Sequence, residues 1–245
     1  CYLSQMNRDE LLAAGEDPLD PCGYFIINGT EKALISIEDL APNRIFVSRE
    51  KEKDLIQAKV FSTRLGFRGR ITVDRTKEGK LSVTLPSFNK SIELLVLLKA
   101  LGLDKQEKIY AAFSDTPFIV NDLLLNWEAE AEIKTKKDAL EAIGKRAAPG
   151  QPVDYQLKRS ELLIDRYLLP HIGVEEKDRL AKAYYLCRMA ERAVMTAYRK
   201  RKPEDKDHYA NKRIKITGKL MEELFRYAFQ FFVKDDAYQL ERANI

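Results

Sequence analysis

Histidine and cysteine are scarce in this sequence, which has two histidines and three cysteines in 245 residues. The cysteines, at positions 1, 22 and 187, are too scattered for a zinc site and too few for a disulfide framework. We therefore expect a reducing, intracellular compartment. His171, which follows Pro170, is predicted to be a packed loop residue, and His208 is predicted to be structural. No catalytic or metal cluster is expected within the chain.

Long apolar runs are also missing, because the longest pure run, such as residues 94–98, is far shorter than the ~20 residues that span a membrane. The sequence also lacks a positively charged start followed by an apolar stretch, which is the pattern of an export signal. The net charge of +4 is modest and is by itself a weak pointer to nucleic acid. What is present is 45% hydrophobic and 33% charged residues, which predicts a sizeable core beneath a charged surface.

The chain is expected to be a fragment, because it begins at Cys1 and residues 218–245 still have the pattern of an amphipathic helix. A β-hairpin is predicted around Asn28-Gly29, a pair that accepts the positive φ angles of a two-residue type I′ turn. The charged run 49–54 is predicted to be a solvated loop. A small antiparallel sheet is predicted from residues 59–64, 70–74 and 81–85, and helices over 92–101, 116–127, 135–147, 155–169 and 177–198.

These elements predict an α+β architecture, with an N-terminal hairpin and small sheet followed by a mainly helical body and a long terminal helix. Thr135 with Asp138 resembles a capping box, and Gly102 is placed to end the helix before it. The glycines at 66–69 superficially suggest a phosphate loop, but the lysine and hydroxyl residue of that motif are absent. A tight hairpin turn is the better interpretation there.

Residues 199–215 form a basic segment, with eight lysines or arginines against three acids and thus a local net charge of +5. Pro203 and the polar run behind it predict a loop between helices. Clustered cations can neutralise phosphates, although a solvated charge run is the plainer reading. Asp205 and Asp207 are spaced like a magnesium-binding pair, but neighbouring Lys206, Lys212 and Arg213 favour an ion-pair network instead.

Two long motifs resemble the second-largest (B or beta) subunit of multisubunit DNA-directed RNA polymerases, in its archaeal-like form. The first is DPCGYFIINGTEK at residues 20–32, and the second is DKDHYANKR at residues 205–213. Between them, LLKALG at 97–102, ALEAIGKR at 139–146 and LLPHI at 168–172 are similar to the lobe of that subunit, in the expected order. Cys22 departs from the family pattern, in which glycine is common.

The resemblance implies three parts: residues 1–40 as a segment of the protrusion, 41–198 as the lobe, and 199–245 as a basic loop and helix returning to the protrusion. Lobe and protrusion would form a wall of the DNA cleft and a docking surface during transcription. The motif cations Lys32, Lys212 and Arg213 become candidate nucleic-acid contacts by this resemblance. The basic segment adds the candidates Lys215, Arg199 and Arg201.

The resemblance also implies that the chain is part of a nucleotidyltransferase without containing its centre, because neither family motif for catalysis is present. No catalytic residue, metal ligand or cofactor is expected here, and Mg²⁺ would be held by another subunit. The implied partners are other polymerase subunits, DNA, the RNA–DNA hybrid and transcription factors, with no membrane. The expected location is cytoplasmic, or nuclear in a eukaryote. The alternatives are a protein-interaction scaffold and a free-standing nucleic-acid-binding module.

Overall fold

The computed structural model describes residues 5–50, 54–88, 90–129 and 132–243. The chain divides into two compact units. The central unit is Pro42–Lys206, and the flanking unit combines the chain up to Ala41 with the chain from Asp207 onward. The predicted loop at 49–54 falls partly on residues 51–53, which lie outside the described residues.

The central unit contains a five-stranded antiparallel sheet whose strands follow one another in sequence order. Along β5 (Leu55–Arg64) buried and half-buried residues alternate, because successive side chains of a strand point to opposite faces. Leu65 and Gly66, with φ angles of 48° and 85°, make the tight turn to β6 (Phe67–Arg75). The remaining strands are β4 (Ile45–Glu50), β7 (Leu81–Thr84) and β8 (Ile92–Glu93).

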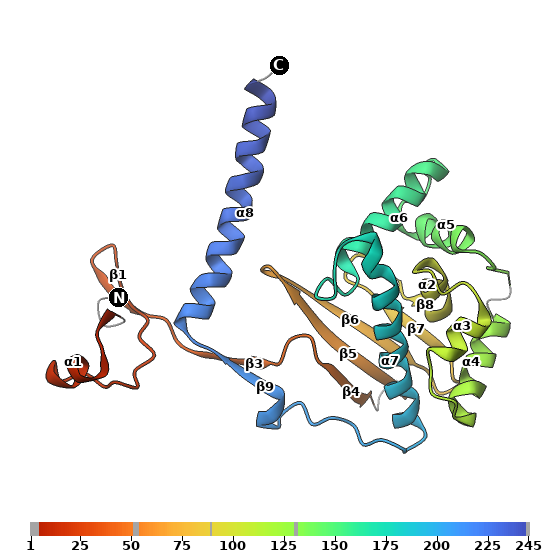
Figure 1. The fold of residues 1–245 in the computed structure, drawn as a ribbon, viewed down its shortest axis with the longest axis horizontal. Coiled ribbons are helices and arrows are strands. Elements are labelled where there is room, and N and C mark those ends of the chain that lie inside the picture. Colours follow the sequence, from red (N-terminus) through yellow and green to blue (C-terminus); the bar gives the residue numbers. More distant parts are fainter. Residues whose placement is uncertain (1–4, 51–53, 89, 130–131, 244–245) are drawn as a thin grey trace. The chain divides into compact units, whose positions relative to one another are not determined.

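Helices supply the rest of the core of the central unit. The longest of them, α7 (Arg179–Ala197), packs on β4, β5 and β6 (Figure 1). Every residue of α2 (Leu94–Ala100) is buried, which explains why its sequence is a nearly continuous apolar run. The other helices are α3 (Gln106–Ala111), α4 (Pro117–Ala129), α5 (Lys136–Ala147), α6 (Val153–Tyr167) and a 3-10 turn at Glu176–Asp178.

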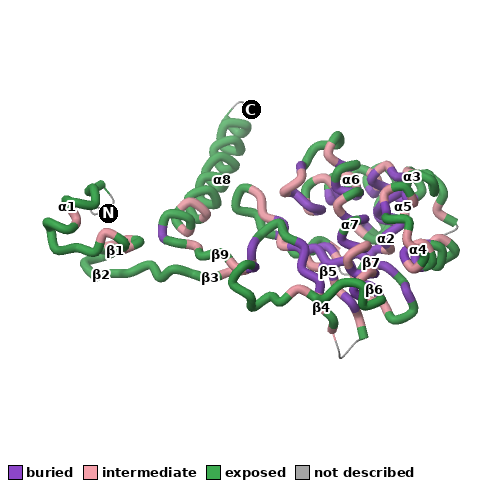
Figure 2. The backbone as a smooth tube through the Cα atoms, turned by 60° about the horizontal axis from the view of Figure 1, so that its bottom comes forward, coloured by how far each residue is buried: buried purple, intermediate pink, exposed green. Residues whose placement is uncertain are grey.

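The flanking unit is assembled from both ends of the chain. Its strands β1 (Tyr24–Ile27) and β2 (Thr30–Ala33) form a hairpin, while β3 (Ile37–Leu40) pairs with β9 (Lys212–Lys215). In Figure 2 the long helix α8 (Thr217–Ala243) is exposed along nearly its whole length, and Thr217 is its one buried residue among those described. A short helix, α1 (Arg8–Ala13), and a 3-10 turn at Tyr209–Asn211 complete this unit.

Gly23 lies just before the hairpin and packs closely against the start of α8. Its φ of 108° lies in a region that disfavours L side chains, and a Cβ atom there would overlap the side chain of Thr217. The Thr217 hydroxyl donates a hydrogen bond of 3.3 Å to the carbonyl of Cys22. Glycine is therefore required where the backbone passes this close to the helix.

The predicted α+β class is confirmed, as are the hairpin, the sheet and the helices at 116–127 and 135–147 in their essentials. Two predicted elements need correction. Ile92 and Glu93 form the edge strand β8, so the helix begins at Leu94 instead of Ile92. Residues Lys212–Lys215 are a strand and not a loop, because their backbone pairs with a distant partner strand.

Candidate nucleic-acid interface

Lys212 lies at the start of β9, opposite Leu40 of β3. Its ammonium group forms an ion pair and hydrogen bond with Glu38, which belongs to the same face of the two-stranded sheet. The hydrogen bond and charge of Glu38 raise the pKa of Lys212, and the charge of Asp207 adds a smaller effect. Much of the charge of this candidate is thus balanced inside the flanking unit.

Lys215 and Arg213 lie on the other face of the strand pair. Lys215 is 3.0 Å from a carboxylate oxygen of Glu223 on α8 and 3.9 Å from one of Asp39. The exposed Arg213 guanidinium donates to the backbone carbonyls of Lys212 and Ala210, at 2.7 and 3.3 Å. Because these acceptors are neutral carbonyls, they do not offset the positive charge of Arg213.

Lys32 is the third residue of β2, opposite Phe25, and its side chain is exposed. The turn itself consists of Asn28 and Gly29, with φ angles of 52° and 74°. Lys32 therefore lies two residue pairs beyond the Ile27–Thr30 pair that closes the turn. A lysine on a strand this short can still extend past the turn.

The other two candidates belong to the central unit, on the stretch that follows α7. Arg199 is exposed and has a φ of 57°. The Arg201 guanidinium donates to one oxygen of Glu204, from Nη2 at 2.6 Å and from Nε at 3.2 Å. The other oxygen of Glu204 accepts from the Val47 amide of β4 at 2.6 Å. Arg201, Lys212 and Lys215 thus have carboxylate partners, whereas Lys32, Arg199 and Arg213 form no ion pair with the residues that the structure describes.

The histidine of the second motif has a local role. His208 Nδ1 accepts a hydrogen bond of 3.1 Å from the Ala210 amide, which caps the 3-10 turn as a structural histidine does. The predicted ion-pair network of Asp205 and Asp207 with Lys206, Lys212 and Arg213 stays a prediction. Lys212 has an acidic partner on another strand. That partner is Glu38, from a strand 174 residues away in sequence.

Two cations that the sequence analysis missed lie on α7, one helical turn apart. Arg188 is exposed and Arg192 is partly buried. Burial lowers the pKa of Arg192, and the nearby charges of Arg201 and Arg188 lower it further. The signal in the sequence was the spacing of two arginines four residues apart on a mainly apolar helix.

His171 and Cys187 are titratable groups in the interior of the central unit, and their contacts are those of packed residues. His171 Nδ1 lies 2.7 Å from the Ser62 hydroxyl, and its ring packs edge-on against Tyr185. Burial lowers the pKa of His171 and raises the pKa of Cys187 to about 12, so the thiol is inert. Among the described residues, no cluster of three or more histidines, cysteines or acids could hold a metal ion.

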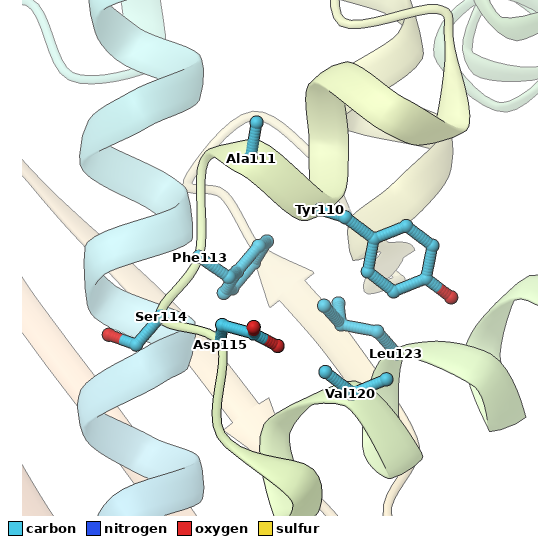
Figure 3. Close-up of a pocket in the computed structure, with 7 residues that line it drawn as sticks. All are labelled: Tyr110, Ala111, Phe113, Ser114, Asp115, Val120 and Leu123. Carbon is cyan, nitrogen blue, oxygen red and sulfur yellow. The ribbon is translucent and has the colours of Figure 1, made fainter.

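A cleft of about 300 Å³ opens between α3 and α4 (Figure 3). Its walls are mainly apolar and include Phe113, Val120 and Leu123. Ser114 turns away from these side chains, and its hydroxyl hydrogen-bonds to Glu191 of α7. No histidine belongs to the lining, so the cleft lacks the histidine base of a serine triad. In the part of the chain that the structure describes, no helix is both long and apolar enough to cross a membrane.

Comparison with known families identifies the family of this chain. Residues 41–215 match the family described as RNA polymerase Rpb2, domain 2. The chain belongs to the RNA polymerase Rpb2, domain 2 family. The match covers the whole central unit and continues through β9 of the flanking unit. The resemblance seen in the two sequence motifs is thereby confirmed.

Curated relatives extend the similarity of this Rpb2 domain 2 protein beyond the family match. Over 251 residues, and 100% of this chain, it is 50% identical to the DNA-directed RNA polymerase subunit Rpo2N of Halobacterium salinarum, of which 48% is covered. It is 48% identical over 250 residues to Rpo2N of Methanocaldococcus jannaschii, covering 50% of that protein. Subunit Rpo2 of Saccharolobus solfataricus is 41% identical over 245 residues, with 22% covered. The chain spans about half the length of the Rpo2N relatives.

Proposed function

We propose that this chain is the lobe and the adjoining part of the protrusion of subunit 2 of a DNA-directed RNA polymerase. The observation that carries this proposal is the similarity of the whole chain to subunits named Rpo2N, at 50% identity in one relative. In the assembled enzyme the chain guides nucleic acid through phosphate contacts that are independent of base sequence. It also offers a docking surface to other subunits and to transcription factors.

The chemistry of nucleotide transfer belongs to another subunit in this proposal. Polymerases transfer nucleotidyl groups with magnesium held by carboxylates. We assign no catalytic step to this chain, because the family's motifs for nucleotidyl transfer do not occur in its sequence. Its contribution is shape and charge.

The candidate contacts differ in how much charge they can offer. Lys212 and Lys215 are balanced by Glu38 and by Glu223, whereas Arg213 donates only to neutral carbonyls. An ion-paired lysine contributes less binding free energy to a phosphate contact, because binding must first displace its carboxylate partner. We therefore rank the six residues in two groups, with Arg213, Lys32 and Arg199 ahead of Lys212, Lys215 and Arg201.

The test uses a polymerase reconstituted with the full-length subunit carrying Lys32→Glu and Arg213→Glu together. We expect its complexes with a DNA–RNA scaffold to dissociate at lower salt than the wild type. Each lost phosphate contact reduces the magnitude of the negative slope of log K against log salt by about 0.9. Lys145→Glu is the matched control, since Lys145 is exposed on α5 and is not a candidate.

Identical salt curves for the double variant and the Lys145→Glu control would refute the contact assignment. If such variants instead lose a transcription factor or a neighbouring subunit, the protein-docking alternative is correct for this surface. The third alternative, a free-standing nucleic-acid-binding module, requires the isolated chain to bind DNA tightly and with strong salt dependence. The balanced charges of Lys212 and Lys215 count against that behaviour.

A further inference from the structure

Three stretches of the central unit meet along one flank of α7. The Tyr185 hydroxyl donates a hydrogen bond of 3.1 Å to the carbonyl of Asn43, just before β4. After α7 ends, the chain turns back, and the amide of Lys200 donates to the carbonyl of Met195 at 2.9 Å. Glu204 then contacts β4, because the Glu204 amide donates a hydrogen bond of 3.0 Å to the carbonyl of Val47. The returning stretch is therefore held beside the last turns of the helix.

This arrangement places Arg201 beside the part of α7 that carries Arg188 and Arg192. Arg188 and Arg192 lie one turn apart and share the side of α7 that carries Tyr185, because residues at spacings of three, four and seven lie on one helix face. The amide of Arg201 approaches the carbonyl of Met195 at 3.3 Å, so Arg201 lies next to the same part of the helix. The charges of both Arg201 and Arg188 act on Arg192.

One nearby acid, Glu204, has a charge that raises the pKa of Arg192, against burial and the charges of the two other arginines, which lower it. Glu204 binds Arg201 with one oxygen and the Val47 amide with the other, which leaves it little capacity for another cation. Glu191 precedes Arg192 in sequence but reaches the other way, to the amide and hydroxyl of Ser114. Among the described residues, neither Arg188 nor Arg192 has a carboxylate partner within ion-pair distance.

We propose that Arg188 and Arg192 form a phosphate site that holds the backbone of a nucleic-acid strand, next to the ion pair of Arg201 with Glu204. The proposal rests on the function given above and extends it to α7. An arginine fork matches two phosphate oxygens, and partial burial weakens competition from water. A phosphate would supply the negative charge that the cluster lacks.

The cations on the stretch that follows α7 favour a polyanion over a single small anion as the ligand. Arg199, Lys200 and Lys202 are exposed and continue the positive charge along the returning stretch. Regularly repeated cations suit the regularly repeated phosphates of a nucleic acid. An acidic protein segment is the competing ligand, and the experiment includes it as an outcome.

The experiment compares polymerases assembled with full-length wild-type subunit, Arg192→Met, and Arg188→Met with Arg192→Met. Binding of a 30-base-pair DNA duplex is measured over a series of salt concentrations, and the melting temperature of each subunit is recorded. We expect the salt slope to fall by about one for each arginine that contacts a phosphate. Arg192→Lys should restore part of the binding. Arg159→Met, an exposed arginine on α6, is the control and should leave the slope unchanged.

The melting temperature separates a binding site from a structural one. Because Arg192 is partly buried among like charges, Arg192→Met should melt at the same or a higher temperature while binding DNA less well. A lower melting temperature together with wild-type DNA binding would overturn the proposal. Binding of polyglutamate, as a model of an acidic protein segment, is measured for the same variants. Loss of polyglutamate binding with unchanged DNA binding would also overturn the proposal and would identify an acidic protein ligand. If the wild-type enzyme bound DNA without salt dependence, the proposed function itself would fail.

Discussion

Replacing Asp122 with alanine should cost the central unit a large part of its stability. Asp122 of α4 is 1% exposed and accepts from Arg75 of β6, at 2.6 Å from Nε and 3.1 Å from Nη2. The Tyr198 hydroxyl donates to the same carboxylate at 3.0 Å. The alanine variant leaves a buried guanidinium and a hydroxyl without their acceptor.

The expected loss follows from the asymmetry of buried ion pairs. Removing one partner costs about 3–5 kcal/mol, because the remaining charge stays buried and uncompensated. The Arg75 side chain is 10% exposed, so it cannot recover water without opening the contact between β6 and α4. Replacing both residues, as Asp122→Leu with Arg75→Met, should recover much of the loss, since an apolar pair leaves no unpaired charge.

Urea unfolding of the chain, followed by the fluorescence of Trp127, measures this loss. Trp127 is the only tryptophan of the sequence and lies on α4, so its signal reports on the central unit. Glu93→Ala is the control, because Glu93 pairs with Arg146 at 2.7 Å while both side chains are about 40% exposed, and such pairs contribute less than ~1 kcal/mol. Equal losses for Asp122→Ala and Glu93→Ala would refute the reasoning.

Three further predictions concern the same unit. Burial lowers the pKa of Lys182 to about 8, whereas its ordinary value is 10.5, so the unfolded chain binds more protons between these pH values. Urea stability should therefore rise from pH 8 to 10.5 in the wild type and rise less in Lys182→Met; parallel profiles would contradict this. Gly144→Ala would place a Cβ 2.8 Å from the carbonyl oxygen of Gln156, so we expect a net loss of ~1–3 kcal/mol on urea unfolding, and any stabilisation would count against this close contact. Thr135→Ala removes a cap at 3.2 Å from the amide of Asp138 and should cost ~1 kcal/mol in the same assay, whereas Thr135→Ser should not; equal losses would contradict a capping role.

Features set by neighbouring residues could be predicted from the sequence. Asn28-Gly29 makes the predicted turn because both residues tolerate positive φ angles. Thr135 and Asp138 form the predicted capping box, with reciprocal hydrogen bonds between side chain and backbone. Gly102, with a φ of 106°, ends the helix as expected. In each case the information lies within a few residues.

Features set by distant residues could not be predicted in the same way. The sequence of β9, Lys-Arg-Ile-Lys, has one apolar residue and directly follows a polar run, so it resembles a loop. It becomes a strand because Ile37–Leu40 supplies hydrogen-bonding partners in antiparallel register. Strand β8 was missed for a related reason, since two residues carry too little pattern to distinguish a strand from the first turn of a helix.

The candidate interface shows why counting charge along a sequence misjudges a surface. The basic segment has a local charge of +5, yet the register of β9 places Lys212 near Glu38 and Lys215 near Asp39, so two of its cations are balanced by a strand outside the segment. On α7 the opposite happens, because folding brings Arg201 beside Arg188 and Arg192 while Glu191 turns to Ser114. Affinity for a polyanion depends on the cations that have no carboxylate partner within the protein. A cation that must first release a carboxylate contributes little binding free energy to a phosphate contact. The arginines of α7 should therefore affect DNA binding more than Lys212 or Lys215, although a sequence count ranks them in the reverse order.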